Sequence, residues 1–489
     1  MPTTLLLDAL PDKEVKGEVP AEVAGLAYDS RKVEPGCLFV AVHGLRTDGR
    51  RFVPEALSRG AAGVVAEPPD PLPGERRLRV LVPDTREALA RLADAYYRFP
   101  SGDLLIVGIT GTNGKTTTSY LVEALLRANG HATGVIGTIQ YRIGQTGRPA
   151  GQTTPESPEL QALLAEMRDA GVTACAMEVS SHALELGRVE GIRFRVGVFT
   201  NVTQDHLDFH GTIARYQVAK ARLFAMLPPD GWAILNADDP AHHAMAERTR
   251  ARILTYGVGP GAQIRATRWS SALAGVTMTV ETPAGRMELT SPLIGGHNVS
   301  NLLAATGVGI ALGIPPARIG AVLAQVHAVP GRFEQVDTGQ PFLVVVDYAH
   351  TPDALERVLQ TARKLTPGRL GVVFGCGGDR DRGKRPRMGE IAARLADFTW
   401  ITSDNPRSED PESIIREIVA GVRSVSGSRE SFAIVPDRAE AIRRALEWAG
   451  AGDTVLLAGK GHETYQIIGS AVLPFDDREV ARAILKARP

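Results

Sequence analysis

Short, unbroken apolar runs alternate along the chain with longer segments in which apolar residues recur every three or four positions. Unbroken runs indicate buried strands, and strands that alternate with amphipathic helices predict a mostly parallel sheet covered by helices. In the middle of the chain the predicted strands occupy residues 104–109, 172–177, 194–199 and 232–235. Residues 262–290 differ, because polar and apolar positions alternate around a Pro-Ala-Gly turn, and they predict a local antiparallel insertion.

The same alternation predicts one further domain on each side. The first has apolar runs at 37–42 and 63–66 and a helical pattern at 85–97. The last has strand candidates at 342–346, 370–374, 398–402, 432–435 and 454–457. We therefore predict an α/β protein of three domains: a smaller N-terminal α/β domain (1–102), a central doubly wound, mostly parallel domain (103–337) and a C-terminal Rossmann-like domain (338–489).

Composition and charge exclude several classes of function. The 489 residues are 44% hydrophobic, and 55 basic residues match 55 acidic ones, so the basic excess expected of a nucleic-acid or anionic-membrane binder is missing. Three widely spaced cysteines exclude a cysteine-built zinc site. No apolar stretch approaches the roughly 18 residues of a membrane span, and we expect a soluble, cytoplasmic protein. Nine of the basic residues are lysines, so each lysine is informative.

A glycine-rich segment at 108–118 lies between a predicted strand and a predicted helix. Glycines let backbone N–H groups turn toward phosphate oxygens, and the helix N-terminus adds partial positive charge. Lys115 is placed to reach the β- and γ-phosphates, and Thr116 to put a hydroxyl on Mg²⁺. The general P-loop pattern has glycine where this chain has Ile109. The predicted nucleotide contacts are Gly111, Thr112, Asn113, Gly114, Lys115, Thr116 and Thr117.

This form of the loop resembles the Mur ligase superfamily, the ATP-dependent amide-forming enzymes of peptidoglycan synthesis and their folylpolyglutamate synthetase relatives. The resemblance extends over essentially the whole chain. It implies ATP and Mg²⁺ as cofactors, with Lys115, Glu178, His206 and Lys220 as the catalytic residues.

Three residues outside the loop are candidates for the metal site. Glu178 follows a predicted strand, where ligands bind in open α/β sheets, and a surface carboxylate is the less favoured alternative. His206 stands beside two carboxylates, and a lone histidine is more often a structural hydrogen-bonding group. Lys220 lies on an apolar helix and by itself reads as a snorkelling lysine. The resemblance implies that these three residues and Thr116 hold the metals, with Lys220 carbamylated.

Asn298 and Asn301 are three residues apart at a predicted helix start and so share one face. Capping would explain one of them. The resemblance implies that both contact the adenine and that Arg332 meets ATP.

Four loops dense in charged residues each follow a predicted strand of the last domain, at 347–352, 375–386, 403–409 and 459–463. The resemblance is to members of the family that add the third peptide residue, and the segment 404–407 resembles their meso-diaminopimelate recognition motif. An arginine fork suits the second carboxylate of meso-diaminopimelate, which lysine lacks. The implied amine contacts are Arg380, Asp404, Asn405, Pro406, Arg407, Gly459 and Glu463.

Segments of the first two domains resemble the family's contacts to a uridine-diphosphate sugar peptide. Two positions depart from the family pattern, Gln152 and Leu186, and either departure could remove or rearrange one hydrogen bond. The implied contacts are Tyr28, Ser30, Leu45, Arg46, Thr47, Gln152, Thr153, Thr154, Ser180, Leu186 and Arg188.

The reaction implied is ATP-driven addition of meso-2,6-diaminopimelate to the D-glutamate side-chain carboxylate of UDP-MurNAc-L-Ala-D-Glu through an acyl phosphate. Three alternatives remain open. The first is the same ligase with L-lysine or L-ornithine, because the recognition motif is short. The second is another superfamily ligase, such as a folylpolyglutamate synthetase, and the third is a P-loop NTPase switch that forms no amide. We expect a monomer without nucleic-acid or membrane partners.

Overall fold

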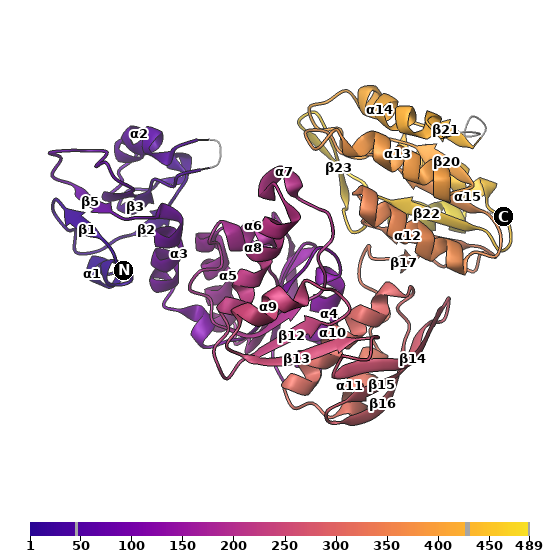
Figure 1. Ribbon diagram of the computed structural model, residues 1–489. Helices are drawn as coiled ribbons and strands as arrows, with labels where there is room; N and C mark the ends of the chain where they lie inside the picture. Colours follow the sequence, from indigo (N-terminus) through magenta and orange to yellow (C-terminus); the bar gives the residue numbers. More distant parts are fainter. Residues whose placement is uncertain (45–46, 426–430, 488–489) are drawn as a thin grey trace. The chain divides into compact units, whose positions relative to one another are not determined.

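The computed structural model describes residues 1–44, 47–425 and 431–487. It divides the chain into two compact units, one of residues 1–264 with 304–314 and one of residues 265–303 with 315–489. Mixed α/β structure runs through both, as the strand and helix alternation predicts (Figure 1). Within the described residues, no helix is long and apolar enough to cross a membrane.

The first unit begins with a five-stranded sheet in the order β1-β5-β4-β3-β2, in which only the β1–β5 pairing is antiparallel. The strands are β1 (Glu14–Lys16), β2 (Gly25–Ala27), β3 (Cys37–Val40), β4 (Gly63–Ala66) and β5 (Leu78–Leu81). The helices are α1 (Thr3–Asp8), α2 (Val53–Ser58) and α3 (Thr85–Tyr96). Asp84 caps α3 by accepting hydrogen bonds from the backbone N–H groups of Arg86 and Glu87.

The larger sheet of the first unit runs in the order β13-β12-β11-β6-β10-β7-β8-β9, and it is parallel from β13 to β7. Strands β8 and β9 are antiparallel additions at one edge. The strands are β6 (Leu105–Thr110), β7 (Thr133–Ile136), β8 (Gln140–Ile143), β9 (Thr146–Pro149), β10 (Ala174–Glu178), β11 (Phe194–Phe199), β12 (Trp232–Asn236) and β13 (Arg252–Gly257). The helices are α4 (Lys115–Ala128), α5 (Ser157–Asp169), α6 (Ser181–Glu185), α7 (Leu207–His210), α8 (Ile213–Ala225) and α9 (His242–Arg248).

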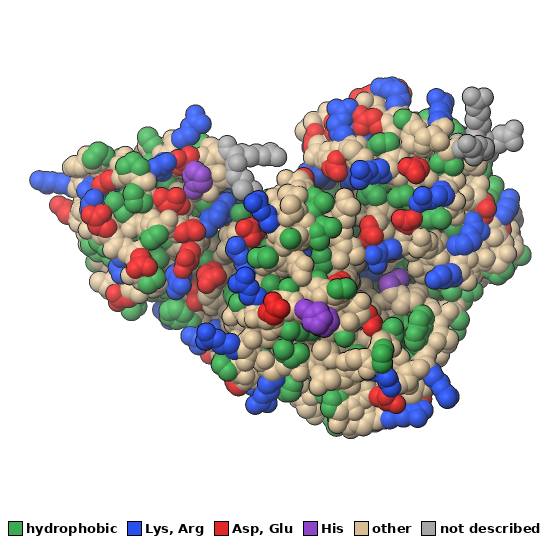
Figure 2. Space-filling model, in the orientation of Figure 1, with side chains coloured by type: hydrophobic (Ala, Val, Ile, Leu, Met, Phe, Trp, Pro, Cys, Tyr) green, Lys and Arg blue, Asp and Glu red, His purple; other side chains and the backbone are tan. Residues whose placement is uncertain are grey.

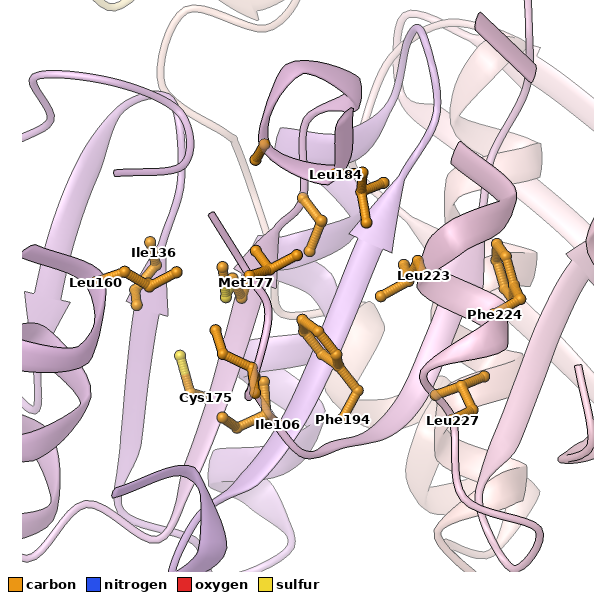
Figure 3. Packing of buried hydrophobic residues seen from close by; sticks show 14 of the residues in the cluster. Ile106, Ile136, Leu160, Cys175, Met177, Leu184, Phe194, Leu223, Phe224 and Leu227 are labelled. Atoms are coloured by element: carbon orange, nitrogen blue, oxygen red, sulfur yellow. The ribbon is translucent and has the colours of Figure 1, made fainter. Parts of the chain in front are cut away.

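The core of this sheet explains one glycine of the loop region. In Figure 3, Ile106, Phe194 and Leu223 lie close together in the cluster that fills one face of the sheet. Gly108 belongs to β6, and a Cβ there would stand 2.8 Å from the Phe194 ring. Gly108 is therefore a packing residue under an aromatic ring, while the phosphate loop proper begins at Gly111.

The second unit contains the predicted antiparallel insertion, a meander of β14 (Ile264–Ala272), β15 (Gly275–Thr282) and β16 (Gly285–Ser291). Helix α10 (His297–Ala311) belongs to both units, and α11 (Pro316–Leu323) follows it.

A six-stranded sheet in the order β17-β18-β22-β19-β20-β21 forms the rest of the second unit, and only β17 is antiparallel. The strands are β17 (Glu334–Gln335), β18 (Leu343–Asp347), β19 (Leu370–Phe374), β20 (Phe398–Ile401), β21 (Phe432–Ile434) and β22 (Thr454–Ala458). The helices are α12 (Pro352–Leu365), α13 (Lys384–Leu395), α14 (Pro411–Arg423), α15 (Arg438–Trp448) and α16 (Asp477–Lys486). A hairpin of β23 (Tyr465–Ile468) and β24 (Ala471–Pro474) precedes α16.

Successive residues of these strands point to opposite faces of the sheet. Val372 and Leu456 join the core beneath α12, α13 and α14, whereas Val373 and Leu457 join the core beneath α15 and α16. Helices thus cover both faces. The four charged loops lie at the carboxyl ends of the strands, the edge at which open α/β sheets generally bind ligands.

Candidate functional site

The phosphate loop of the first unit is a run of backbone between β6 and α4. Gly114 has φ +86° and stands immediately before α4, so the helix begins directly at Lys115. Lys115 Nζ donates to the carbonyl oxygens of Gly111 and Thr112, both at 2.9 Å. The ammonium thus lies over the loop that the sequence predicts to hold phosphate, at the positive end of a helix.

The loop is tied to the segment that follows β11. Thr112 N donates to Asn201 O at 2.8 Å, and Asn113 N donates to Asn201 Oδ1 at 3.0 Å. At Gly111, a Cβ would overlap the Thr200 hydroxyl, so only glycine allows this approach. Asn201 was not predicted from the sequence, although it lies in the same segment as His206.

Glu178, at the end of β10, is held in a buried polar cradle. Its carboxylate accepts hydrogen bonds from Thr116 Oγ1 at 3.1 Å, Thr138 N at 2.9 Å and Thr138 Oγ1 at 3.0 Å. The residue is 1% exposed. The structure thus brings together Thr116 and Glu178, a hydroxyl and a carboxylate of the kind that hard cations prefer. Thr138 is a further member of this cradle that the sequence did not identify.

Lys220 lies on the buried face of α8 rather than snorkelling to solvent. Its side chain is 1% exposed, and its Nζ lies 4.2 Å from the centroid of the Tyr216 ring. Burial, with the nearby Lys115 cation as a second cause, lowers the pKa of Lys220 well below its usual value. A neutral amine is the form that reacts with CO₂, so the setting suits the carbamate implied for this position.

His206 precedes α7 in a left-handed conformation with φ +52°. Its Nε2 lies 3.5 Å from Asp205 Oδ2, and its ring centroid lies 4.7 Å from that of His182. Burial lowers the pKa of His206 and so favours the neutral imidazole that a metal ligand requires. Among the residues that the structure describes, no three His, Cys, Asp or Glu side chains are grouped so as to hold a metal ion.

The predicted sugar-peptide contacts after β9 connect to the Glu178 cradle. Thr153 Oγ1 lies 3.1 Å from Thr138 Oγ1, and Thr154 Oγ1 donates to Glu178 O and accepts from Ser180 N. Arg188 donates to Gln152 Oε1 at 2.8 Å and to Thr154 O at 3.1 Å. Gln152 thus has a partner in Arg188.

The remaining predicted contact of this stretch, Leu186, caps the end of α6. Its backbone N–H donates to His182 O at 2.8 Å. Its side chain is apolar and cannot form a hydrogen bond.

The predicted uridine-site residues lie on the five-stranded part of the first unit. Tyr28 donates its hydroxyl to Glu159 Oε1 at 2.9 Å, and burial raises the pKa of Tyr28. Ser30 donates to Glu55 Oε2 at 2.8 Å, and Thr47 O accepts from Gly44 N. Leu45 and Arg46, predicted at the same site, lie outside the described residues.

The predicted adenine residues lie on α10, as expected. Asn298 Nδ2 donates to Ile294 O at 2.8 Å, and Asn301 Nδ2 donates to Asn298 Oδ1 at 2.9 Å. Arg332 stacks its guanidinium 4.9 Å from the Tyr348 ring centroid.

In the second unit, the four charged loops meet at one edge of the sheet. Asn405 joins three of them: its carbonyl oxygen accepts from Gly378 N at 2.9 Å, its Nδ2 donates to Glu463 Oε2 at 2.8 Å and its Oδ1 accepts from Lys460 Nζ at 3.3 Å. Lys384 Nζ donates to the carbonyl of His350 and brings in the fourth loop. Because each loop follows a predicted strand, and parallel strands end at the same edge of a sheet, the sequence predicts this convergence, and the structure confirms it.

Arg407 is held by backbone contacts in a left-handed conformation, with φ +53°. Its N–H donates to Ile467 O at 3.1 Å, and its carbonyl accepts from Gly469 N at 2.7 Å, so the β23–β24 hairpin brackets the residue. Arg407 Nη1 donates to Gly378 O at 2.7 Å. Arg380, in the same loop as Gly378, donates from Nη1 to the carbonyl of Asp379.

Two acidic residues of the same sheet edge pair with a lysine. Glu463 and Asp404 lie on either side of Lys460, whose Nζ is 3.2 Å from Glu463 Oε2 and 3.5 Å from Asp404 Oδ1. Burial and the neighbouring Asp404 raise the pKa of Glu463. Gly459 lies against Asp404, since a Cβ there would stand 3.1 Å from Asp404 Oδ2. The edge therefore offers acidic and basic groups within one small region, as an amino acid with two charged ends requires. On the face drawn in Figure 2, acidic and basic side chains are likewise interspersed.

Three family models match the chain: the Mur ligase family catalytic domain at residues 22–97, the Mur ligase middle domain at 109–309 and the Mur ligase glutamate ligase domain at 331–461. Similar curated proteins include the UDP-N-acetylmuramoyl-L-alanyl-D-glutamate–2,6-diaminopimelate ligase of Geobacillus thermodenitrificans, 48% identical over 99% of both chains. The ligase of the same name from Thermosynechococcus vestitus is 48% identical over 96% of this chain and 94% of its own.

Solved structures of ligases are also similar to this chain. A structure of a UDP-N-acetylmuramoyl-L-alanyl-D-glutamate–2,6-diaminopimelate ligase is 35% identical, covers 99% of this chain and 98% of its own, and has a TM-score of 0.70. MurF ligase from Thermotoga maritima in complex with ADP covers 95% of this chain and 98% of its own at a TM-score of 0.62. Because the two sequences are only 22% identical, this similarity shows a shared fold and nothing more.

Proposed function

Since the chain belongs to the Mur ligase family, we propose that it joins meso-2,6-diaminopimelate to the D-glutamate side chain of UDP-MurNAc-L-Ala-D-Glu, with ATP converted to ADP and phosphate. Full-length relatives at 48% identity carry the name of that ligase. The reaction belongs to peptidoglycan precursor synthesis. We place the reaction in the cytoplasm and expect the enzyme to be a monomer.

The chemistry proceeds in two balanced steps. A carboxylate oxygen of D-glutamate attacks the γ-phosphorus of ATP, the bond to the β,γ-bridging oxygen breaks, and an acyl phosphate and ADP result. The neutral amine of diaminopimelate then attacks the acyl carbon, phosphate leaves, and the amine proton is released. Lys115, over the phosphate loop, offsets the negative charge that builds on the transferred phosphoryl group. Asn298 and Asn301 contact the adenine, and Arg332 contacts ATP.

Mg²⁺ fits the cradle around Glu178, because Thr116 and Glu178 place a hydroxyl and a carboxylate 3.1 Å apart in a buried setting. We assign Thr116, Glu178, His206 and Lys220 as its holders. Bound Mg²⁺ would neutralise phosphate charge and polarise the phosphoryl group. Lys220 takes part as a carbamate, formed when its neutral amine adds CO₂ and releases a proton.

The sugar peptide is assigned to segments of the five-stranded part of the first unit and to segments that contact the Glu178 cradle. Tyr28, Ser30 and the 45–47 segment take the uridine diphosphate, and Gln152 to Thr154 with Ser180, Leu186 and Arg188 take the muramoyl dipeptide. The hydrogen bonds from Thr153 and Thr154 toward the Glu178 cradle support a substrate carboxylate arriving beside the phosphate loop.

The convergence of Asp404, Asn405, Arg407 and Glu463 at one sheet edge carries the assignment of the amine. Arg407 and Arg380 take the distal carboxylate of meso-diaminopimelate, and Glu463 takes its distal ammonium. Pro406 and Gly459 shape the backbone around them.

The test is phosphate release with Mg-ATP and UDP-MurNAc-L-Ala-D-Glu, with meso-diaminopimelate, L-lysine and L-ornithine supplied in parallel. We expect turnover with diaminopimelate at least about a hundredfold above the other amines. Preference for lysine or ornithine would keep the ligase and refute the amine assignment. Steady ATP hydrolysis without any amine dependence would refute the ligase.

The Lys220 assignment has its own readout. Protein equilibrated with ¹³C-labelled bicarbonate should show one carbamate carbon resonance in its NMR spectrum, and Lys220→Ala should lose it. Lys364→Ala, a lysine of α12 in the second unit, is the matched control and should keep the signal. A wild-type spectrum without the resonance would refute the carbamate.

A further inference from the structure

Arg385, in the first turn of α13, is a buried cation that no step of the proposed reaction uses. It is 0% exposed, although arginine is among the residues least often fully buried. Two carboxylates surround it. Its Nη1 and Nη2 each donate to one oxygen of Glu409, at 2.9 and 2.8 Å, and Nη1 also donates to Glu417 Oε2 at 2.8 Å. A two-pronged, charge-assisted contact of this kind fixes geometry as well as supplying energy.

The Arg385–Glu409 pair reaches both loops that hold the amine-site arginines. Arg385 Nη2 donates to Gly377 O at 3.3 Å, and Glu409 Oε1 accepts from Asp379 N at 2.6 Å. Glu409 itself closes the 403–409 loop, two residues after Arg407. The hydrogen bond from Arg385 lowers the pKa of Glu409 to about 2, so the pair is charged throughout the neutral range.

Between these two anchors the loops are in backbone contact. Gly378 N donates to Asn405 O, and Gly378 O accepts from Arg407 Nη1. A Cβ on Gly378 would overlap the Pro406 carbonyl, so the loops are as close as glycine allows. Ser408 Oγ adds a hydrogen bond to Asp379 Oδ1 at 2.6 Å. The guanidinium of Arg407 therefore takes its direction from a loop that Arg385 and Glu409 hold in place.

We propose that Arg385 and Glu409 are positioning residues for amine selection, which aim Arg407 at the distal carboxylate of the incoming amino acid without touching it. The inference rests on the proposed function, because it names the residues that set the selectivity of the same site. Loss of the pair lets the 375–383 loop move away from the 403–409 loop. The distal carboxylate then meets an Arg407 guanidinium that is no longer held in one direction. An amine without that carboxylate loses no binding affinity.

The test is Arg385→Met, which keeps much of the side-chain length and removes the charge. We expect KM for meso-diaminopimelate to rise about 10- to 100-fold, the range expected for misplacing one charge-assisted contact. The kcat should stay within a few-fold, and KM for ATP should not change. The ratio of kcat/KM for diaminopimelate to that for L-lysine should fall by the same factor as KM rises.

The matched control is Arg369→Met. Arg369 pairs with Asp453 at 2.7 Å in the same unit, but both residues lie where strands β19 and β22 begin, at the sheet edge away from the loops. This variant should lose thermal stability without any change in the diaminopimelate-to-lysine ratio. If Arg385→Met loses stability and keeps the ratio as well, the pair is structural only and the proposal is overturned.

A milder variant guards against failure to fold. Glu409→Gln keeps the side-chain volume and an oxygen for Asp379 N, and it removes the ion pair. We expect a change in KM and in the amine ratio of the same sign as for Arg385→Met and smaller, and an unchanged ratio would overturn the proposal. A wild-type enzyme without amine-dependent phosphate release is a different outcome, because it refutes the proposed function itself.

Discussion

The two halves of the proposed catalytic apparatus are built from different chemical groups. In the first unit, the proposed phosphate loop between β6 and α4 consists of backbone N–H and carbonyl groups, with one lysine lying over them. In the second unit, the proposed amine site consists of side chains from four loops that pair with one another, and Asn405 joins three of these loops. A site made of backbone depends on a short stretch of chain. A site made of paired side chains depends on the whole sheet edge.

This difference predicts how each site fails. Substitutions in the phosphate loop should abolish chemistry for every amine alike. Substitutions at the sheet edge should change which amine is chosen and leave phosphoryl transfer nearly intact.

The largest effect is expected for Lys115→Met. Removal of the ammonium that lies over the loop should lower kcat by at least about a thousandfold with every amine, because charge on the transferred phosphoryl group is no longer offset. Phosphate release under saturating substrates measures it. If the loss of kcat in this variant depended on the amine, the two sites would not act separately.

Arg407→Met should lower kcat/KM for meso-diaminopimelate about a hundredfold and leave the value for L-lysine unchanged, because only the former has a second carboxylate to lose. Competition between the two amines in one reaction, read by mass spectrometry of the product, gives the ratio directly. An equal loss for both amines would show that Arg407 supports the fold of the loop rather than recognition.

Gly378→Ala probes the closeness of the loops without altering any charge. The added Cβ would overlap the Pro406 carbonyl, so the 375–383 loop must shift. KM for diaminopimelate should rise about tenfold, and stability should fall by about 1–3 kcal/mol, as for an overpacked site. Gly383→Ala in the same loop, where the nearest atom to an added Cβ is a side-chain oxygen at 3.2 Å, should change KM less than twofold.

The smallest effect is expected for Asp94→Asn, in α3 of the first unit, and it concerns stability alone. Asp94 is 8% exposed, and burial raises the pKa of its carboxyl to about 6. Because this folded-state pKa lies above the unfolded value, ionisation of Asp94 destabilises the protein as pH rises through 6. Asp94→Asn should therefore raise stability at pH 8 by about 1–3 kcal/mol and change it little at pH 4. Urea unfolding at both pH values measures the difference, and equal effects at the two would contradict the assigned pKa.

Much of the fold could be predicted from the sequence, and the sequence also indicated a nucleotide site. Alternating strands and helices, the antiparallel insertion and the convergence of four loops follow from local patterns and the rule that parallel strands share an edge. The phosphate loop was recognisable because its chemistry lies in consecutive residues. The roles proposed for His206 and Lys220 came from the resemblance to a known family, because spacing alone left them open.

The partners across the fold could not be predicted from sequence. Thr138 meets Glu178 from 40 residues away, and Arg385 meets Glu409 from 24. Nothing in the local pattern distinguishes Arg385 from the exposed arginines around it, because its burial follows from the packing of α13 against α14. Similarly, Gly108 reads as part of the phosphate loop until the Phe194 ring is seen against it.

The left-handed backbone of Arg407 has a consequence for how selectivity could change over evolution. Glycine or asparagine would adopt this conformation more easily than arginine, and two hydrogen bonds to the β23–β24 hairpin hold it there. The hairpin lies 58 residues or more beyond the recognition motif in the sequence. If Arg407 selects the amine as proposed, insertions, deletions or turn substitutions in 465–474 should change the amine preference while residues 404–407 stay the same. Substitutions in this hairpin therefore offer a way to alter the choice of the third peptide residue without changing the side chains proposed to bind it.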